Sequence, residues 1–194
     1  MEAALRLDVA ELAGLPILSG APSGRELYNK LVASLPTEPD YPEPIFLDFG
    51  KVQVATASFL RESILQFRDF VRGRKSNFYP VVANAASDII DEILELVQPR
   101  GEVIMTCVVD DNGEVLRSRH IGKLDPMQKL TFDLVNAQGE TTASKLMESE
   151  ASGIKATAWN NRLASLCSLG LIYEQAQGRT KTYRPLFSGG TNGG

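Results

Sequence analysis

The sequence has little of the chemistry on which metal proteins and many enzymes depend. Its 194 residues contain two cysteines and one histidine. A single histidine excludes a zinc site built from a Cys/His cluster. Cys107 and Cys167 lie in apolar segments, so we expect buried thiols in a reducing compartment, and we expect His120 to be a polar strand residue. Neither a Gly-Lys-Ser/Thr phosphate loop nor a GxGxxG motif occurs. The sequence therefore predicts no cofactor, no metal and no catalytic constellation.

Long hydrophobic runs and an excess of positive charge are also missing. No apolar run approaches the roughly 20 residues that a bilayer crossing needs. Residues 1–14 lack the basic and apolar regions of a signal peptide. These absences predict a cytoplasmic protein without membrane contact. Twenty Lys and Arg stand against 24 Asp and Glu, which gives a net charge of -4. Any nucleic-acid surface must therefore be local.

The charge balance and the expected secondary structure both change near residues 122–126, where a β-rich segment is followed by a helical one. Residues 1–123 carry 13 basic and 18 acidic groups, whereas residues 124–194 carry 7 and 6. The segment 155–184 is the most basic part of the chain. We therefore predict two domains, over 1–123 and 124–187. The glycine-rich residues 188–194 are expected to form a disordered tail.

The first part alternates strand and helix patterns. Strands are predicted over 45–49, 79–83, 103–109 and 114–121, and Asn112-Gly113 between the last two is a strong hairpin signal. Helices are predicted over 24–35, from an N-cap at Ser58 to the basic turn 72–75, and from an N-cap at Ser87 or Asp88 to Val97. Prolines in 36–44 exclude regular structure there. The alternation predicts an α/β domain with crossover connections and a mixed sheet.

Residues 45–52, Ile-Phe-Leu-Asp-Phe-Gly-Lys-Val, followed by Thr56-Ala-Ser-Phe-Leu60, resemble the signature of STAS domains of anti-anti-sigma factors. Gly24-Arg25 before the first helix resembles a divergent STAS-like family, and the likeness covers roughly residues 15–100. The resemblance implies a switch serine at a helix N-terminus, where a partner kinase adds phosphate. Ala57 occupies that position here, between Thr56 and Ser58. Arg25, Asp48, Thr56 and Ser58 are therefore candidate switch or docking residues, with Asp48 expected as a hydrogen-bonding group at a strand end.

The second part has the pattern of three helices and a β-hairpin. Helices are predicted over 125–138, 142–147 and 154–169, and strands over 171–173 and 182–186, joined by a polar loop at 174–181. Met127, Leu130, Phe132, Leu134 and Val135 supply the apolar side of the first helix, and Trp159, Leu163, Leu166 and Leu169 that of the third. The run resembles the winged helix-turn-helix of bacterial transcription regulators, with residues 168–172 at the helix exit and a basic wing. The expected fold class of this part is α+β.

The resemblance implies that the third helix lies in the major groove of double-stranded DNA. Thr157, Asn160 and Asn161 then face the base edges, because Asn can pair with adenine and Thr suits a phosphate or a thymine methyl. The remaining expected DNA contacts are polar or basic groups around this helix, at Ser144, Lys145, Lys155, Arg162, Arg179 and Lys181.

The sequence thus predicts a homodimeric, DNA-binding transcription regulator in which a STAS-like sensing or docking domain controls a winged-helix reader. One alternative is a protein-interaction module that binds a histidine-kinase-like ATPase and no DNA. A second alternative is an enzyme with activity near Arg25, Asp48, Thr56 and Ser58.

Overall fold

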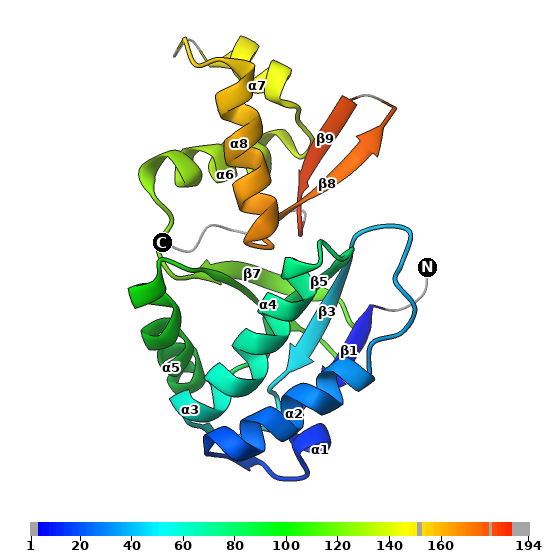
Figure 1. The fold of residues 1–194 in the computed structure, drawn as a ribbon, viewed down its shortest axis with the longest axis vertical. Coiled ribbons are helices and arrows are strands. Elements are labelled where there is room, and N and C mark those ends of the chain that lie inside the picture. The colour runs from blue at the N-terminus through cyan, green and yellow to red at the C-terminus, as the bar shows by residue number, and fades with distance from the viewer. Residues whose placement is uncertain (1–3, 151–152, 179, 188–194) are drawn as a thin grey trace.

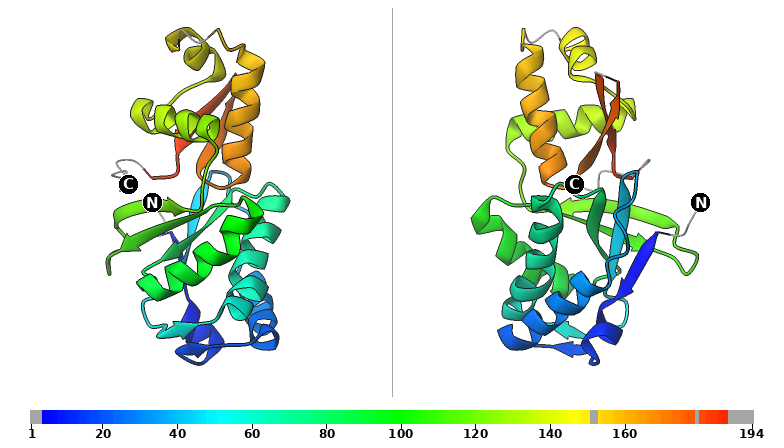
Figure 2. Two further views of the ribbon diagram at one scale, coloured as in Figure 1. Left: turned by 90° about the vertical axis from the view of Figure 1, so that its left-hand side faces the viewer. Right: turned by 45° about the vertical axis from the view of Figure 1, so that its right-hand side comes forward.

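The computed structural model describes residues 4–150, 153–178 and 180–187. An N-terminal part with a central sheet is followed by three helices and a hairpin, which lie together on one side of that sheet (Figure 1 and Figure 2). The N-terminal elements are β1 (Leu5–Asp8), α1 (Val9–Ala13), β2 (Ile17–Leu18), α2 (Ala21–Ala33), β3 (Glu43–Asp48), β4 (Val54–Ala55), α3 (Ala57–Leu60), the π-helical segment η1 (Arg61–Leu65), α4 (Gln66–Gly73), β5 (Phe78–Ala83), α5 (Ser87–Val97), the 3-10 turn η2 (Gln98–Arg100), β6 (Ile104–Val109) and β7 (Val115–Ile121).

The main sheet has five strands in the order β1-β3-β5-β6-β7. The first four are parallel, and β7 pairs with β6 in the antiparallel direction through the turn at Asn112-Gly113. Because the spatial order follows the chain, the crossover helices α2, α4 and α5 cover the same face. A mixed sheet with helices is therefore present, as the sequence predicts.

Alternate side chains of the strands divide the apolar residues between two buried clusters. Ile45 and Leu47 of β3 point to the helix-covered face, whereas Phe46 between them points to the opposite face. Phe46 belongs to the same buried cluster as Trp159 and Leu163 of the C-terminal helices. The C-terminal part therefore packs against the second face of the sheet, and the two parts share this second cluster.

The start of the chain contributes an edge strand that the sequence analysis did not predict. Leu5–Asp8 pairs in parallel with β3, and Asp8 then caps α1 by accepting a hydrogen bond from the backbone of Glu11. A separate two-stranded sheet joins β2 and β4. Strands of four and two residues carry too few side chains for a periodic pattern to mark them.

Two predicted helix N-caps are wrong by one or two positions. Thr56, not Ser58, is the N-cap of α3, and Ser58 lies inside the first turn. Ala86, not Ser87 or Asp88, is the N-cap of α5. Neither cap side chain accepts a hydrogen bond from the first turn of its own helix, so packing of the apolar face, rather than capping, fixes where these helices begin.

Gly24-Arg25 lies inside α2, which begins at Ala21, and so does not precede the helix as the sequence analysis predicted. A Cβ atom at position 24 would lie 2.7 Å from the carbonyl oxygen of Phe59, closer than real Cβ contacts allow. Glycine thus lets α2 pack directly against α3 and η1. The Gly24-Arg25 element has a structural role at this crossing.

The C-terminal elements are α6 (Pro126–Gln138), α7 (Ala143–Ser149), α8 (Ala156–Ser168), β8 (Ile172–Gln177) and β9 (Thr180–Pro185). The predicted polar loop over 174–181 is wrong: the strands pair as far as Gln177 and Thr180, and Gly178 supplies the turn with a φ of 63°. Polar residues are tolerated in this hairpin because only one of its sides is packed. Thr141, between α6 and α7, adds a bridge to Tyr183 of β9.

The apolar side of α6 is narrower than predicted. Phe132 and Val135 are buried, but Met127 and Leu130 are 38% and 37% exposed. Leu169, expected on the inner side of the third helix, is only partly buried. The predicted tail, 188–194, lies outside the described residues. Within the described ranges no helix has the length and apolarity needed to cross a bilayer.

Candidate functional site

The face of α8 that is predicted to contact DNA bases, called the reading face below, is exposed. Trp159, Leu163 and Leu166 are fully buried and anchor the helix to the core. Thr157, Asn160, Asn161 and Ala164 occupy the other side and are exposed. The helix therefore has one apolar stripe that fixes its position, and one polar face that is available for contact.

The exposed face lies at the end of the molecule that is remote from the main sheet. In Figure 1, α7 and the N-terminal end of α8 are at the top, and the C-terminal end of α8 points toward α4 and β5. Ser144 and Lys145 on α7 and Lys155 at the N-cap of α8 are exposed, and neither lysine forms an ion pair with the described residues. All three residues are therefore open to solvent, and the two lysines carry positive charge without a described counter-charge.

Two predicted DNA contacts are already engaged within the protein. Lys181 is exposed, but its Nζ atom lies 2.8 Å from a carboxylate oxygen of Glu174 on the paired strand. The guanidinium group of Arg162 lies over the ring of Trp159, 5.0 Å from its centre, so this side chain is turned onto the protein. Arg179 is outside the described residues. Of the predicted cations in the described ranges, Lys145 and Lys155 are therefore the exposed ones that lack both a carboxylate partner and a ring.

The hairpin is fixed beside the helices by contacts near its base. Tyr183 is buried, and its backbone exchanges two hydrogen bonds with Thr141 at 2.9 and 2.8 Å. Arg184 forms an ion pair with Glu140. The segment between α6 and α7 thus pairs with β9 and joins the base of the hairpin to these helices.

Asp48 is the hydrogen-bonding strand-end group that the sequence predicts. Its carboxylate is 8% exposed and accepts hydrogen bonds from the side chain of Arg6 at 2.7 Å, the backbone of Gly50 at 2.9 Å and the amide of Asn84 at 3.0 Å. Asn84 has a positive φ of 55° and also accepts a hydrogen bond from the backbone of Val109. This network fastens the ends of β1, β3, β5 and β6 to one another.

The structure does not bring the four candidate switch residues together. Thr56 and Ser58 share a hydrogen bond of 3.3 Å, and Thr56 also accepts one from the backbone of Gly20. Arg25 is exposed and lies 3.6 Å from Glu62 on η1. Within the described part of the chain, no hydrogen bond or ion pair links Asp48 to Thr56, Ser58 or Arg25. Asp48 thus has separate partners, and the arrangement is not a shared catalytic constellation.

Arg72 makes a contact between the two parts of the molecule that the sequence analysis missed. It ends α4, and its guanidinium donates to the backbone oxygens of Ser76 at 2.9 Å, Phe78 at 3.0 Å and Cys167 at 2.8 Å. The same group lies over the ring of Tyr79, 3.8 Å from its centre. The only signal in the sequence was the basic turn 72–75, which by itself indicates a helix end rather than a contact with α8.

Several titratable groups have altered proton affinities because they are buried. Burial raises the pKa of Cys107 and of Cys167 to about 12, as expected for thiols inside a core. Burial lowers the pKa of His120, whose ring meets Phe132 of α6 edge-on at 5.4 Å between centres. Among the described residues, no group of three His, Cys, Asp or Glu side chains is arranged to hold a metal ion.

Comparisons with protein-family models, with curated proteins and with solved structures found no match to this chain.

Proposed function

We propose that this protein is a DNA-binding regulator whose C-terminal part is a winged helix-turn-helix. The observation that carries the proposal is the exposed polar face of α8, which bears Thr157, Asn160 and Asn161 opposite a fully buried stripe. An α-helix is about 10–12 Å across with its side chains and fits the major groove, and asparagine can pair with an adenine edge through two hydrogen bonds.

Charge around α8 supports the same function. Lys155 is the N-cap of α8 and Lys145 lies on α7, which packs against α8; neither has a carboxylate partner among the described residues, so both are available to phosphate. The chain as a whole has a net charge of -4, and binding must therefore depend on this local surface. The hairpin β8–β9 projects beside the helix as a wing. We further propose a homodimer, since paired readers contact two half-sites.

The N-terminal part, for which we propose a STAS-like fold, is suited to control the reader. It contacts the C-terminal end of α8 through Arg72, whereas the proposed reading face lies near the other end. A change in the N-terminal part would therefore reach the DNA-binding helix without blocking it.

Binding to a random duplex library, followed by sequencing, tests the proposal. We expect enrichment of a defined site, and a variant with Lys145, Lys155, Asn160 and Asn161 all changed to Ala should lose it. Ser168→Ala, on the same helix but at the end near the N-terminal part, is the matched control and should bind like the natural chain. No enrichment with the natural chain, or equal enrichment with both variants, would refute DNA binding through this face.

A protein-interaction module is the second candidate. It is favoured by the ion pair of Lys181 with Glu174 and by the stacking of Arg162 on Trp159, which leave less free positive charge than a DNA reader usually presents. Under this function the partner is a histidine-kinase-like ATPase. Capture of such an ATPase by the chain, together with no affinity for any duplex, would favour it.

A further inference from the structure

A cavity of about 400 Å³ lies between α5 and the β6–β7 hairpin, on the helix-covered side of the sheet. Its apolar wall includes Ile90 of α5, Val108 of β6 and Ala85 in the connection after β5. Arg117 and Arg119 of β7 line it as well, and no carboxylate is among its lining residues. Cavities of this size hold small molecules rather than macromolecular segments.

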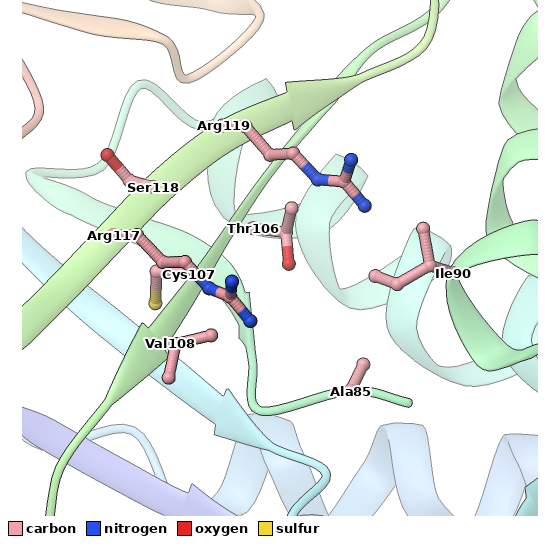
Figure 3. A pocket seen from close by; sticks show the side chains of 8 residues that line it. All are labelled: Ala85, Ile90, Thr106, Cys107, Val108, Arg117, Ser118 and Arg119. Atoms are coloured by element: carbon pink, nitrogen blue, oxygen red, sulfur yellow. The ribbon is translucent and has the colours of Figure 1, made fainter. Parts of the chain in front are cut away.

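The strand register places both arginines on the same side of the hairpin. Arg119 is opposite Thr106 and Arg117 is opposite Val108, whereas Ser118 between them is opposite Cys107. Because side chains alternate along a strand, Arg117 and Arg119 point to one face and Ser118 to the other. Figure 3 shows the two guanidinium groups extending from β7 in the direction of α5, with Thr106 between them and Ile90 beyond.

These two arginines differ from the others in the described part of the chain. The rest are each engaged by a carboxylate, a backbone carbonyl or an aromatic ring, namely Arg6, Arg25, Arg61, Arg68, Arg72, Arg74, Arg100, Arg162 and Arg184. Arg117 and Arg119 are exposed, and neither has a hydrogen-bond acceptor, an ion-pair partner or a ring among the described residues. In a chain of net charge -4, two adjacent arginines without a counter-charge form a local positive site.

We infer that this cavity binds a small organic anion, with its carboxylate or phosphate held by Arg117 and Arg119 and its apolar body against Ile90, Val108 and Ala85. Guanidinium groups match the geometry of both kinds of anion, because each can donate two parallel hydrogen bonds. The apolar wall adds affinity by removing hydrocarbon from water. The site is separate from the proposed DNA-binding face, and its existence does not depend on that function.

Titration of the full ¹⁵N-labelled chain tests the inference, with phenyl phosphate, benzoate, inorganic phosphate and the neutral benzyl alcohol as probes. We expect phenyl phosphate or benzoate to shift the amide signals of residues 106–108 and 117–119 at millimolar concentration. The double variant Arg117→Gln/Arg119→Gln should weaken that binding about tenfold or more, since it removes charged hydrogen bonds. Arg119→Lys should give an intermediate loss of affinity, because lysine keeps the positive charge but cannot donate two parallel hydrogen bonds as a guanidinium group does.

Arg25→Gln is the matched control, since Arg25 is also an exposed arginine of the N-terminal part and lies outside the cavity. It should leave the affinity unchanged. The inference is overturned if neither organic anion shifts these signals up to about 10 mM, the range expected for a fragment of this size. It is equally overturned if the double variant binds as tightly as the natural chain, or if inorganic phosphate or benzyl alcohol binds as well as phenyl phosphate.

Discussion

The guanidinium group of Arg72 donates a hydrogen bond of 2.8 Å to the backbone oxygen of Cys167, 95 residues further along the chain. Cys167 lies in the last turn of α8, and its backbone oxygen also accepts a hydrogen bond of 3.0 Å from the backbone of Gly170, just beyond the helix. A cation at this end also interacts favourably with the helix dipole. One side chain from α4 thus caps the helix that we propose reads DNA, and it joins the two parts of the molecule.

Replacing Arg72 should destabilise the protein and loosen this junction. Arg72→Ala removes one donor from each of three backbone oxygens, of which that of Cys167 keeps its hydrogen bond from Gly170, and it removes the group that lies over Tyr79. We expect the free energy of unfolding to fall by about 2–4 kcal/mol, as for the loss of charged, partly buried hydrogen bonds. Urea denaturation measures the change.

Arg25→Ala serves as the control for Arg72, because its ion pair with Glu62 is exposed and 3.6 Å long. Such pairs contribute about 0–1 kcal/mol. An Arg72→Ala effect no larger than that of Arg25→Ala would show that the contact with Cys167 does not hold the parts together.

The connection between the two parts requires glycine at position 122. Gly122 has a φ of 98°, and a Cβ atom there would lie 2.3 Å from the carbonyl oxygen of Glu102. Gly122→Ala should therefore cost about 3 kcal/mol or more, from backbone strain together with a clash that backbone atoms must relieve. Thermal denaturation of the variant gives the measurement.

Gly101 provides a matched comparison for Gly122. It also has a positive φ, 62°, but a Cβ atom there would meet nothing within 4 Å. Gly101→Ala should therefore cost only about 1 kcal/mol. Equal losses in the two variants would mean that the close approach to Glu102 is unimportant.

His120 should make the protein less stable as the pH falls through the range of histidine titration. Burial lowers its pKa in the folded state below the ordinary value of 6.5, and the charge of Lys129 acts in the same direction, opposed by Asp133. The unfolded chain therefore takes up the proton first, so stability is full above about pH 6.5 and declines below it. The slope for one proton is at most about 1.4 kcal/mol per pH unit.

Urea titrations between pH 5 and pH 7.5 test the role of His120, which is the one histidine of the chain. His120→Gln should flatten the dependence in this range. Lys129→Gln should reduce it, because the remaining charge of Asp133 favours protonation of His120. A natural chain whose stability does not change over this range would contradict the expectation.

Both thiols should be inert to an aromatic disulfide reagent in the folded protein. Cys107 and Cys167 are 4% and 9% exposed, and burial raises the pKa of each to about 12, so the reactive thiolate is scarce. Cys107→Ala and Cys167→Ala variants allow each remaining thiol to be followed alone. Rapid labelling of either thiol without denaturant would show that its surroundings open. In an Arg72→Ala background we expect Cys167 to become labelled faster than Cys107.

Contacts with bases and contacts with phosphates should respond differently to substitution if the proposed function holds. Asn160→Ala or Asn161→Ala should cost about 1–3 kcal/mol on a selected site and relax its sequence preference. Lys145→Ala or Lys155→Ala should weaken binding to all duplexes alike and flatten the slope of log K against log salt by about one unit per lost contact. Anisotropy titrations at several salt concentrations, on selected and random duplexes, separate the two classes. Unchanged affinities and slopes in all four variants would show that DNA does not bind through these residues.

Local patterns in the sequence were sufficient for the elements whose signal is contained within a few residues. Asn112-Gly113 marked the β6–β7 hairpin, and the spacing of Trp159, Leu163 and Leu166 marked the buried side of α8. The α/β alternation likewise predicted a mixed sheet with helices. The short strand β1 and the full length of the β8–β9 hairpin were missed, because their pairing depends on strands elsewhere in the fold more than on their own side chains.

The sequence by itself determined which residues are apolar, where turns occur and which face of α8 is polar, since periodicity and turn chemistry act over one or two helical turns. Only the tertiary structure decided which charged groups are free. Lys181 and Glu174 meet across a hairpin, Arg72 reaches α8, and Arg117 and Arg119 share a cavity without a counter-charge. Whether a charged side chain has a partner depends on distances of a few ångströms between segments far apart in the chain. These distances are fixed when the sheet and the C-terminal helices pack together.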